Sequence, residues 1–185
     1  MSFWNGILRL AGWDVDKTAP VGVKKMVIVV GPHTSNWDFV IGYLALRSYK
    51  VKAKFLIKKE LFVGPLGWFL KRAGGIPVDR KNKNHNFTDQ AVRYFTDNEE
   101  MFLIFTPEAT RSYNPNWKLG FYYIAKRAKV PIYICYLDYK NKKGGFLKPF
   151  EMTEDVDADI AEIKATLSQF EGRFPENGIR RVEEE

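Results

Sequence analysis

The chain has little of what disulfide-bonded, metal-binding and membrane-spanning proteins are built from. Its 185 residues include one cysteine, Cys135. A single cysteine excludes an internal disulfide framework and a Cys-x-x-Cys metal motif, and it is typical of a protein from a reducing, cytoplasmic compartment. No apolar run approaches the roughly 20 residues that span a bilayer, so we predict no transmembrane helix.

Positive charge is what the chain has in excess. Its formal net charge is +7. Eleven lysines or arginines against two acids lie between Arg47 and Lys83, whereas eleven acids against four bases lie in 151–185. A basic middle predicts an anionic partner such as phosphate, nucleic acid, an anionic membrane or an acidic carrier protein, unless it is only a solvated face. Most aromatic residues lie in apolar runs, so we expect no nucleic-acid binding.

The order of elements predicts a single α/β domain over residues 1–185. Apolar strand-like runs alternate with segments of helical periodicity, which favours a mostly parallel central sheet flanked by helices. The predicted strands are 26–30, 53–57, 76–78, 101–105 and 131–136, with a candidate late strand at 146–150. The predicted helices are 36–48, 65–73, 85–97, 117–129 and 156–170.

The two ends of the domain are predicted to differ from its centre. Residues 1–22 are predicted to form an amphipathic N-terminal helix and a linker, with an apolar stripe between Phe3 and Ala11. That stripe fits a membrane surface and also fits a helix packed on the domain's own core. Residues 172–185 are predicted to form a flexible acidic tail.

Polar side chains follow the predicted strands, at the edge where ligands of open α/β sheets bind. His33 follows the first strand, Arg80 the third, Asp138 the fifth, and Glu108 and Arg111 the fourth. Because the carboxyl ends of parallel strands meet at one edge, we expect these side chains to converge there.

The pair His33 and Asp38 has the chemistry of a general base and its orienting acid. Five residues on a helix place two side chains about 140° apart, so the histidine must precede the helix. Ser35 is a good N-cap, and Asp38 then occupies the third helical position, as in a capping box. From there Asp38 can reach the imidazole and fix its tautomer, leaving the other ring nitrogen as a base. The alternative is a helix cap beside a surface histidine.

No serine or cysteine nucleophile motif accompanies this pair, so we expect the base to deprotonate a substrate hydroxyl.

The other polar residues suit a phosphorylated ligand. Gly75 permits a close approach of the ligand, and Arg80 and Arg111 can each grip a phosphate through two hydrogen bonds. Glu108 can orient a substrate hydroxyl or hold an arginine. The alternative to ligand binding is a structural role, in which the glycine only forms a turn and the charged side chains only form ion pairs at the surface.

Four blocks, taken in order, resemble the glycerolipid acyltransferases of the 1-acyl-sn-glycerol-3-phosphate acyltransferase type. They are His33 with Asp38, Gly-Gly-Ile-Pro-Val-Asp-Arg at 74–80, Phe-Thr-Pro-Glu-Ala-Thr-Arg-Ser at 105–112, and Val-Pro-Ile at 130–132. Two departures concern the third block. Ala109 stands where that family usually has glycine, and Thr106 is an extra residue before the proline.

The resemblance implies an O-acyltransferase that moves a fatty acyl group from acyl-CoA or acyl carrier protein to a free hydroxyl of a lysophospholipid. His33 would be the general base and Asp38 its orienting acid. Arg80, Arg111, Glu108 and Gly75 would bind the acceptor. The thioester is a co-substrate, and no cofactor or metal is expected. Such a protein would be cytoplasmic and peripherally bound to an anionic membrane surface, at its inner face.

One further stretch suits a lipid substrate. An apolar run that ends in two basic residues contains Phe62, Leu66, Trp68 and Phe69. We expect these side chains to line an acyl tunnel or to contact the membrane. Packing in the core is the alternative.

Two other functions remain open. A non-catalytic, peripheral protein that binds anionic lipid would need the basic residues but not His33. A hydrolase would use water in place of the acceptor hydroxyl.

Overall fold

The computed structural model describes residues 2–16, 20–78 and 87–180. Within these ranges, seven strands form one sheet in the order β1-β7-β6-β2-β5-β3-β4. All neighbouring pairs are parallel except the antiparallel pair β6 and β7. The strands are β1 (Asp14–Val15), β2 (Lys25–Gly31), β3 (Lys54–Lys58), β4 (Gly75–Val78), β5 (Met101–Phe105), β6 (Ile132–Asp138) and β7 (Lys143–Phe150). The predicted α/β fold is therefore confirmed.

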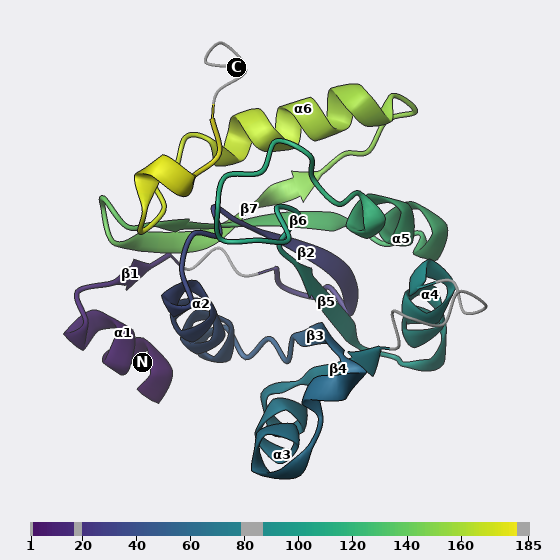
Figure 1. Cartoon of the computed structure of the whole chain (residues 1–185), viewed down its shortest axis with the longest axis horizontal. Coiled ribbons are helices and arrows are strands. Elements are labelled where there is room, and N and C mark those ends of the chain that lie inside the picture. Colours follow the sequence, from purple (N-terminus) through teal and green to yellow (C-terminus); the bar gives the residue numbers. More distant parts are fainter. Residues whose placement is uncertain (1, 17–19, 79–86, 181–185) are drawn as a thin grey trace.

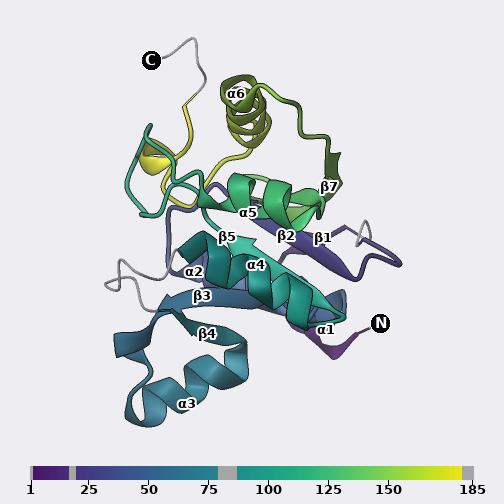
Figure 2. The same cartoon turned by 90° about the vertical axis from the view of Figure 1, so that its right-hand side faces the viewer.

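Helices cover both faces of this sheet (Figures 1 and 2). The α-helices are α1 (Phe3–Leu10), α2 (Trp37–Ser48), α3 (Gly64–Ala73), α4 (Phe87–Asp97), α5 (Gly120–Ala128) and α6 (Val156–Leu167). Single 3₁₀ turns are η1 (Lys59–Leu61) and η2 (Pro175–Asn177). Within the described ranges, no helix is long and apolar enough to cross a membrane.

The central strand β2 shows why the sheet lies between two helical layers. Successive side chains of a strand point to opposite faces. Val27 and Val29 pack in the cluster that includes residues of α4, α5 and α6, whereas Met26 and Ile28 pack in the cluster that includes Leu46 of α2. A strand buried on both faces reads as a continuous apolar run, which is how it was predicted.

The N-terminal segment differs from the predicted helix and linker, because it contains a strand. Asp14–Val15 pairs in parallel with β7 and forms one end of the sheet. Helix α1 packs on α2 through Leu8, which is buried, while Phe3 and Leu10 of α1 are 74% and 91% exposed. Leu8 therefore packs in the core, and the exposed Phe3 is available for contact with a membrane surface.

Candidate active site

The sheet edge at which the sequence predicts polar side chains to converge is present, because β5 and β6 both pair with β2 in parallel. We call this carboxyl edge the rim. The loop after β2 carries His33, and the loop after β5 carries Glu108. The segment after β6 carries Tyr139. These three loops therefore meet at the carboxyl edge of the sheet, where α2 begins.

Asp38 reaches the imidazole of His33 as its spacing predicted. His33 Nδ1 lies 3.1 Å from Asp38 Oδ2. The same carboxylate oxygen accepts hydrogen bonds of 2.8 Å from the backbone N–H groups of Thr34 and Ser35. Ser35 Oγ accepts from Trp37 N at 3.2 Å, and the N-cap of α2 is Asn36, not Ser35. Of the predicted capping box, in which Ser35 Oγ would accept from Asp38 N, only the bond from Ser35 N to the Asp38 carboxylate is therefore present.

Tyr139 is the site residue that the sequence did not suggest. Its hydroxyl donates a 2.6 Å hydrogen bond to Asp38 Oδ1, the carboxylate oxygen that faces away from the imidazole. Its ring packs edge-on against Trp13 at 4.9 Å, and its backbone N–H donates to Glu171 O at 2.8 Å. Burial and the bond to Asp38 raise the pKa of Tyr139, so its hydroxyl keeps the proton that it donates.

Asp38 remains ionised although it is buried. Burial raises the pKa of Asp38, but the hydrogen bonds from His33, Tyr139 and Ser35 outweigh it and hold the pKa below its usual value. An ionised Asp38 favours a proton on His33 Nδ1 and leaves Nε2 as the acceptor. Nε2 has no hydrogen-bond partner among the described residues, and the side chain of His33 is 20% exposed. The imidazole can therefore accept a proton from a ligand at the rim.

Glu108 supports the loop that carries His33. Glu108 is 5% exposed, and its Oε1 accepts a 2.9 Å hydrogen bond from the backbone N–H of His33. Asn114 Nδ2 donates to the backbone carbonyl of Glu108 at 2.8 Å. Oε2 has no partner among the described residues. Burial raises the pKa of Glu108, and the bond from His33 only partly offsets this.

Replacement of Glu108 by glutamine is expected to change how stability depends on pH. Because the pKa of Glu108 is raised in the folded protein, the folded state binds its proton more readily than the unfolded state does. The wild type should therefore gain stability relative to Glu108→Gln as the pH falls from about 7 to about 4. Urea unfolding midpoints across this range measure the difference. A difference that is independent of pH would contradict the prediction.

Ala109 has a backbone conformation that disfavours alanine. Its φ is +55°, in the left-handed region, and its N–H closes a turn onto Thr106 O at 3.0 Å. A side chain there costs about 1–2 kcal/mol. The turn places Glu108 in the protein interior, and the glycine usual in the resembling family would meet the same φ without this cost.

Ala109→Gly is therefore expected to stabilise the fold by about 0.5–1 kcal/mol, after the added entropy of glycine in the unfolded chain is subtracted. The test is a higher urea midpoint at an unchanged m-value. A midpoint equal to or below that of the wild type would contradict the strain inferred from φ.

The remaining predicted residues are not all at the rim. Arg111 is exposed on the loop after β5 that also carries Glu108, whereas Arg80 lies outside the described residues. Gly75 begins β4, about 10 Å along the strand from its carboxyl end. A Cβ on Gly75 would lie 2.8 Å from Leu70 O, so its local effect is to let α3 approach the sheet.

The apolar run splits into an inner and an outer part. Phe62 is half-buried, and its ring would lie 3.1 Å from a Cβ on Gly75. Leu66, Trp68 and Phe69 are more than half exposed on α3. Packing in the core is therefore excluded for these three side chains.

Asp138 has a structural role, because its carboxylate accepts hydrogen bonds from Lys140 N and Asn141 N and so closes the turn before β7.

The predicted C-terminal tail is corrected for residues 172–180, which pack on the rim. Phe174 N donates to Thr34 Oγ1 at 3.2 Å, and a Cβ on Gly172 would lie 2.7 Å from the Thr34 side chain. Arg180 stacks on the ring of Tyr113, 4.0 Å from its centroid, in the loop after β5. Few apolar residues occur in this segment, so the sequence carried no periodic signal for it.

Tyr139→Phe is expected to lower about tenfold the rate of any reaction in which His33 accepts a proton, without changing a substrate's KM. The change removes one hydrogen bond to a buried carboxylate, but it keeps the ring that packs on Trp13. A positioning residue should affect kcat alone, so steady-state kinetics of the folded variant are the test. An unchanged kcat, or an equal effect on kcat and KM, would contradict this role.

Comparison with known proteins places these features in a family. A family model described as Acyltransferase matches residues 14–138. The chain therefore belongs to the acyltransferase family, which confirms the resemblance drawn from the four sequence blocks. The crystal structure of the 1-acyl-sn-glycerophosphate (LPA) acyltransferase PlsC from Thermotoga maritima is similar in fold. Its TM-score is 0.63 at 14% identity, over 90% of this chain and 74% of that chain. No curated protein matches the chain.

Proposed function

We propose that the protein transfers a fatty acyl group from an acyl thioester to a free hydroxyl of a lysophospholipid, such as 1-acyl-glycerol-3-phosphate. The donor is acyl-CoA or acyl carrier protein. The observation that carries the proposal is the arrangement around His33, in which Nδ1 lies 3.1 Å from a fully hydrogen-bonded Asp38 and Nε2 is open at the rim.

His33 acts as the general base in this scheme. Its Nε2 takes the proton of the acceptor hydroxyl while the hydroxyl oxygen attacks the thioester carbonyl carbon. The tetrahedral intermediate collapses when the carbon–sulfur bond breaks, and the departing thiolate receives the proton held by the imidazolium. Asp38 does not touch the reacting atoms. It orients the ring and favours the imidazolium electrostatically. Base catalysis of this kind contributes about 10²–10⁴-fold.

The acceptor phosphate is assigned to arginines. Arg111 is exposed on the loop that also carries Glu108. Arg80, the last residue of the second sequence block, is the other arginine assigned to the phosphate. Guanidinium groups bind phosphate oxygens with paired, charge-assisted hydrogen bonds. Glu108 keeps the His33 loop in place through its bond to the backbone. Gly75 is less suited to the acceptor site than its sequence block suggested, because it lies at the amino end of its strand.

The proposal is tested with two acceptors that share one free hydroxyl, and only the ester formed at that shared hydroxyl is counted, because removal of the phosphate frees a second one. Labelled acyl groups are supplied on coenzyme A and, separately, on acyl carrier protein. The acceptors are lysophosphatidate and monoacylglycerol, which lacks the phosphate. We expect transfer to lysophosphatidate at least about tenfold faster, because charged hydrogen bonds to the phosphate are lost with monoacylglycerol. Equal rates would remove the phosphate site. No transfer from either donor by folded protein would favour the non-catalytic lipid binder.

A further inference from the structure

A cavity lies at the carboxyl end of α2, away from His33. Its volume is about 220 Å³, and it lies between the carboxyl ends of α2 and α3 and the start of β3. The cationic residues in its lining are Arg47, Lys52, Lys54, Lys71 and Arg72, and no acidic side chain of the described ranges lines it. Arg47 lies nine residues after Asp38 on α2, which is about 14 Å along the helix axis. The cavity is therefore separate from the histidine site.

Helix ends account for only part of this charge. The carboxyl end of a helix attracts cations, which explains Arg47 at the end of α2 and the two basic residues at the end of α3. It does not explain Lys52 and Lys54, which lie in the loop before β3 and at its start. Within the described ranges, none of the five cations makes a salt bridge with an acidic side chain. A bound anion would relieve their mutual repulsion.

Two contacts hold guanidinium groups in fixed positions at this cavity. The Tyr43 hydroxyl accepts hydrogen bonds from Arg47 Nε at 3.1 Å and Nη2 at 2.9 Å. The Arg72 guanidinium lies 5.9 Å from the centroid of the Trp68 ring. The buried side chains of Leu46 and Val51 also line the cavity. An apolar wall of this kind weakens solvent screening and strengthens the attraction for an anion.

We propose that this cavity binds a phosphate group, either of a lipid headgroup or of the acyl donor. Arginine forks and lysine ammonium groups are the side chains that bind phosphate. At about 30 Å³ per water molecule, the volume of about 220 Å³ admits a phosphate together with part of the group attached to it. Only the choice of these two sources rests on the proposed acyl transfer.

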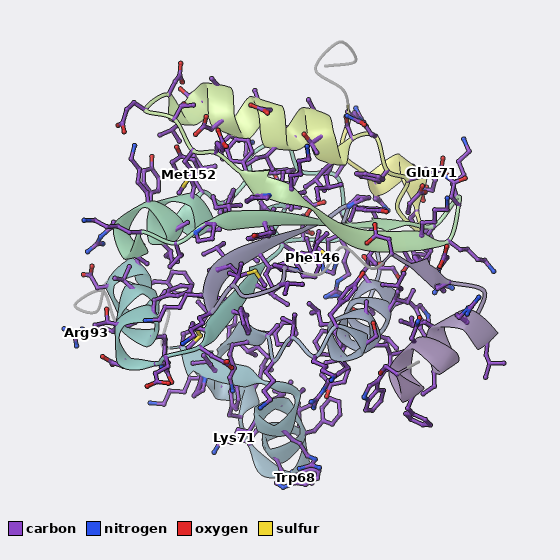
Figure 3. All side chains as sticks on the ribbon, turned by 180° about the vertical axis from the view of Figure 1, so that it is seen from behind. Trp68, Lys71, Arg93, Phe146, Met152 and Glu171 are labelled. Atoms are coloured by element: carbon purple, nitrogen blue, oxygen red, sulfur yellow. The ribbon has the colours of Figure 1, made fainter. Side chains whose placement is uncertain are left out.

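The surface beside the cavity contains apolar side chains that suit a lipid source. Trp68 is 68% exposed, and Leu66 and Phe69 of the same helix are also exposed. Figure 3 shows Trp68 and Lys71 on α3, with Trp68 at the end of the molecule farthest from α6. The same phosphate chemistry is also offered by coenzyme A, so binding experiments with both sources are needed.

The test compares two double variants that remove the same charge. Lys52→Gln with Lys54→Gln alters the cavity. Lys143→Gln with Lys148→Gln alters two exposed lysines of β7, which is separated from β3 by three intervening strands of the sheet. Coenzyme A is titrated into each protein by calorimetry. Separately, each protein is sedimented with phosphatidylcholine vesicles with and without phosphatidic acid. Unfolding midpoints check that all the proteins are folded.

We expect at least one probe to bind the cavity variant about tenfold or more weakly than the wild type, with the β7 variant like the wild type. Loss of coenzyme A binding identifies the donor as the source of the phosphate. Loss of binding to vesicles containing phosphatidic acid identifies the lipid headgroup. If neither probe distinguishes the cavity variant from the β7 variant, the proposal is overturned. Because binding is measured without turnover, absence of transferase activity would not affect this result.

Discussion

His33→Ala is expected to lower kcat for acyl transfer by about 10²–10⁴-fold and to leave the protein folded, with an unfolding midpoint lowered only by the loss of one hydrogen bond to Asp38. The side chain supplies Nε2 at the rim, whereas the hydrogen bond that holds its loop comes from the backbone N–H to Glu108 Oε1. Alanine keeps that backbone bond. The loss should therefore fall mainly on the reaction.

Rescue by added imidazole separates a missing base from a misplaced loop. In the alanine variant, the space left by the ring can admit a free imidazole, and we expect part of the lost rate to return with its concentration. The wild type serves as the control and should not respond. A variant that retains the wild-type rate would remove His33 from the mechanism, and so would a rate loss accompanied by unfolding without rescue.

Asp38→Asn is expected to lower kcat by a similar factor, with KM for both substrates little changed. In a Ser-His-Asp triad the equivalent change costs about 10⁴-fold. Here the amide oxygen can still accept from His33 Nδ1 and from the Thr34 and Ser35 N–H groups, as the carboxylate does. The negative charge that favours the imidazolium is lost. Steady-state kinetics with both substrates varied provide the measurement.

Stability gives a second reading of the same variant. The pKa of Asp38 is held below its usual value in the folded protein, because hydrogen bonds from His33, Tyr139 and Ser35 outweigh burial. The ionised carboxylate therefore contributes stability above the unfolded pKa of 3.8, and this contribution is lost as the pH falls through the lower folded value. The wild type should be more stable than Asp38→Asn at neutral pH, and the difference should narrow in acid. A constant difference would mean that the carboxylate charge does not stabilise the fold.

The parts of the fold that the sequence predicted are those with strong local patterns. The strand at 101–105 was predicted with the bounds that the structure shows, because a short apolar run ends at a threonine and a proline. β1 was not predicted. Two residues cannot show alternation, and β1 is a strand only because β7 lies beside it. The segment 172–180 was likewise predicted as part of a tail. Its contacts with Thr34 join residues far apart in the chain, and no local pattern indicates them.

The same distinction holds within the candidate site. The approach of Asp38 to His33 could be predicted because helix capping fixes it within six residues. The bond from Tyr139 to Asp38 joins residues 101 positions apart, and it depends on β6 ending beside β2. No spacing in the sequence encodes that neighbourhood. Burial of Glu108 was also unforeseen, because it follows from the left-handed turn at Ala109.

The most direct test of acyl transfer straight to the acceptor hydroxyl is the release of free thiol from an acyl thioester, followed with and without lysophosphatidate. The account predicts release only when the acceptor is present, in equal amount to the ester formed, with no acyl group left on the protein. Release that does not need the acceptor would instead indicate a hydrolase. A stable acyl-protein would contradict direct attack by the acceptor hydroxyl.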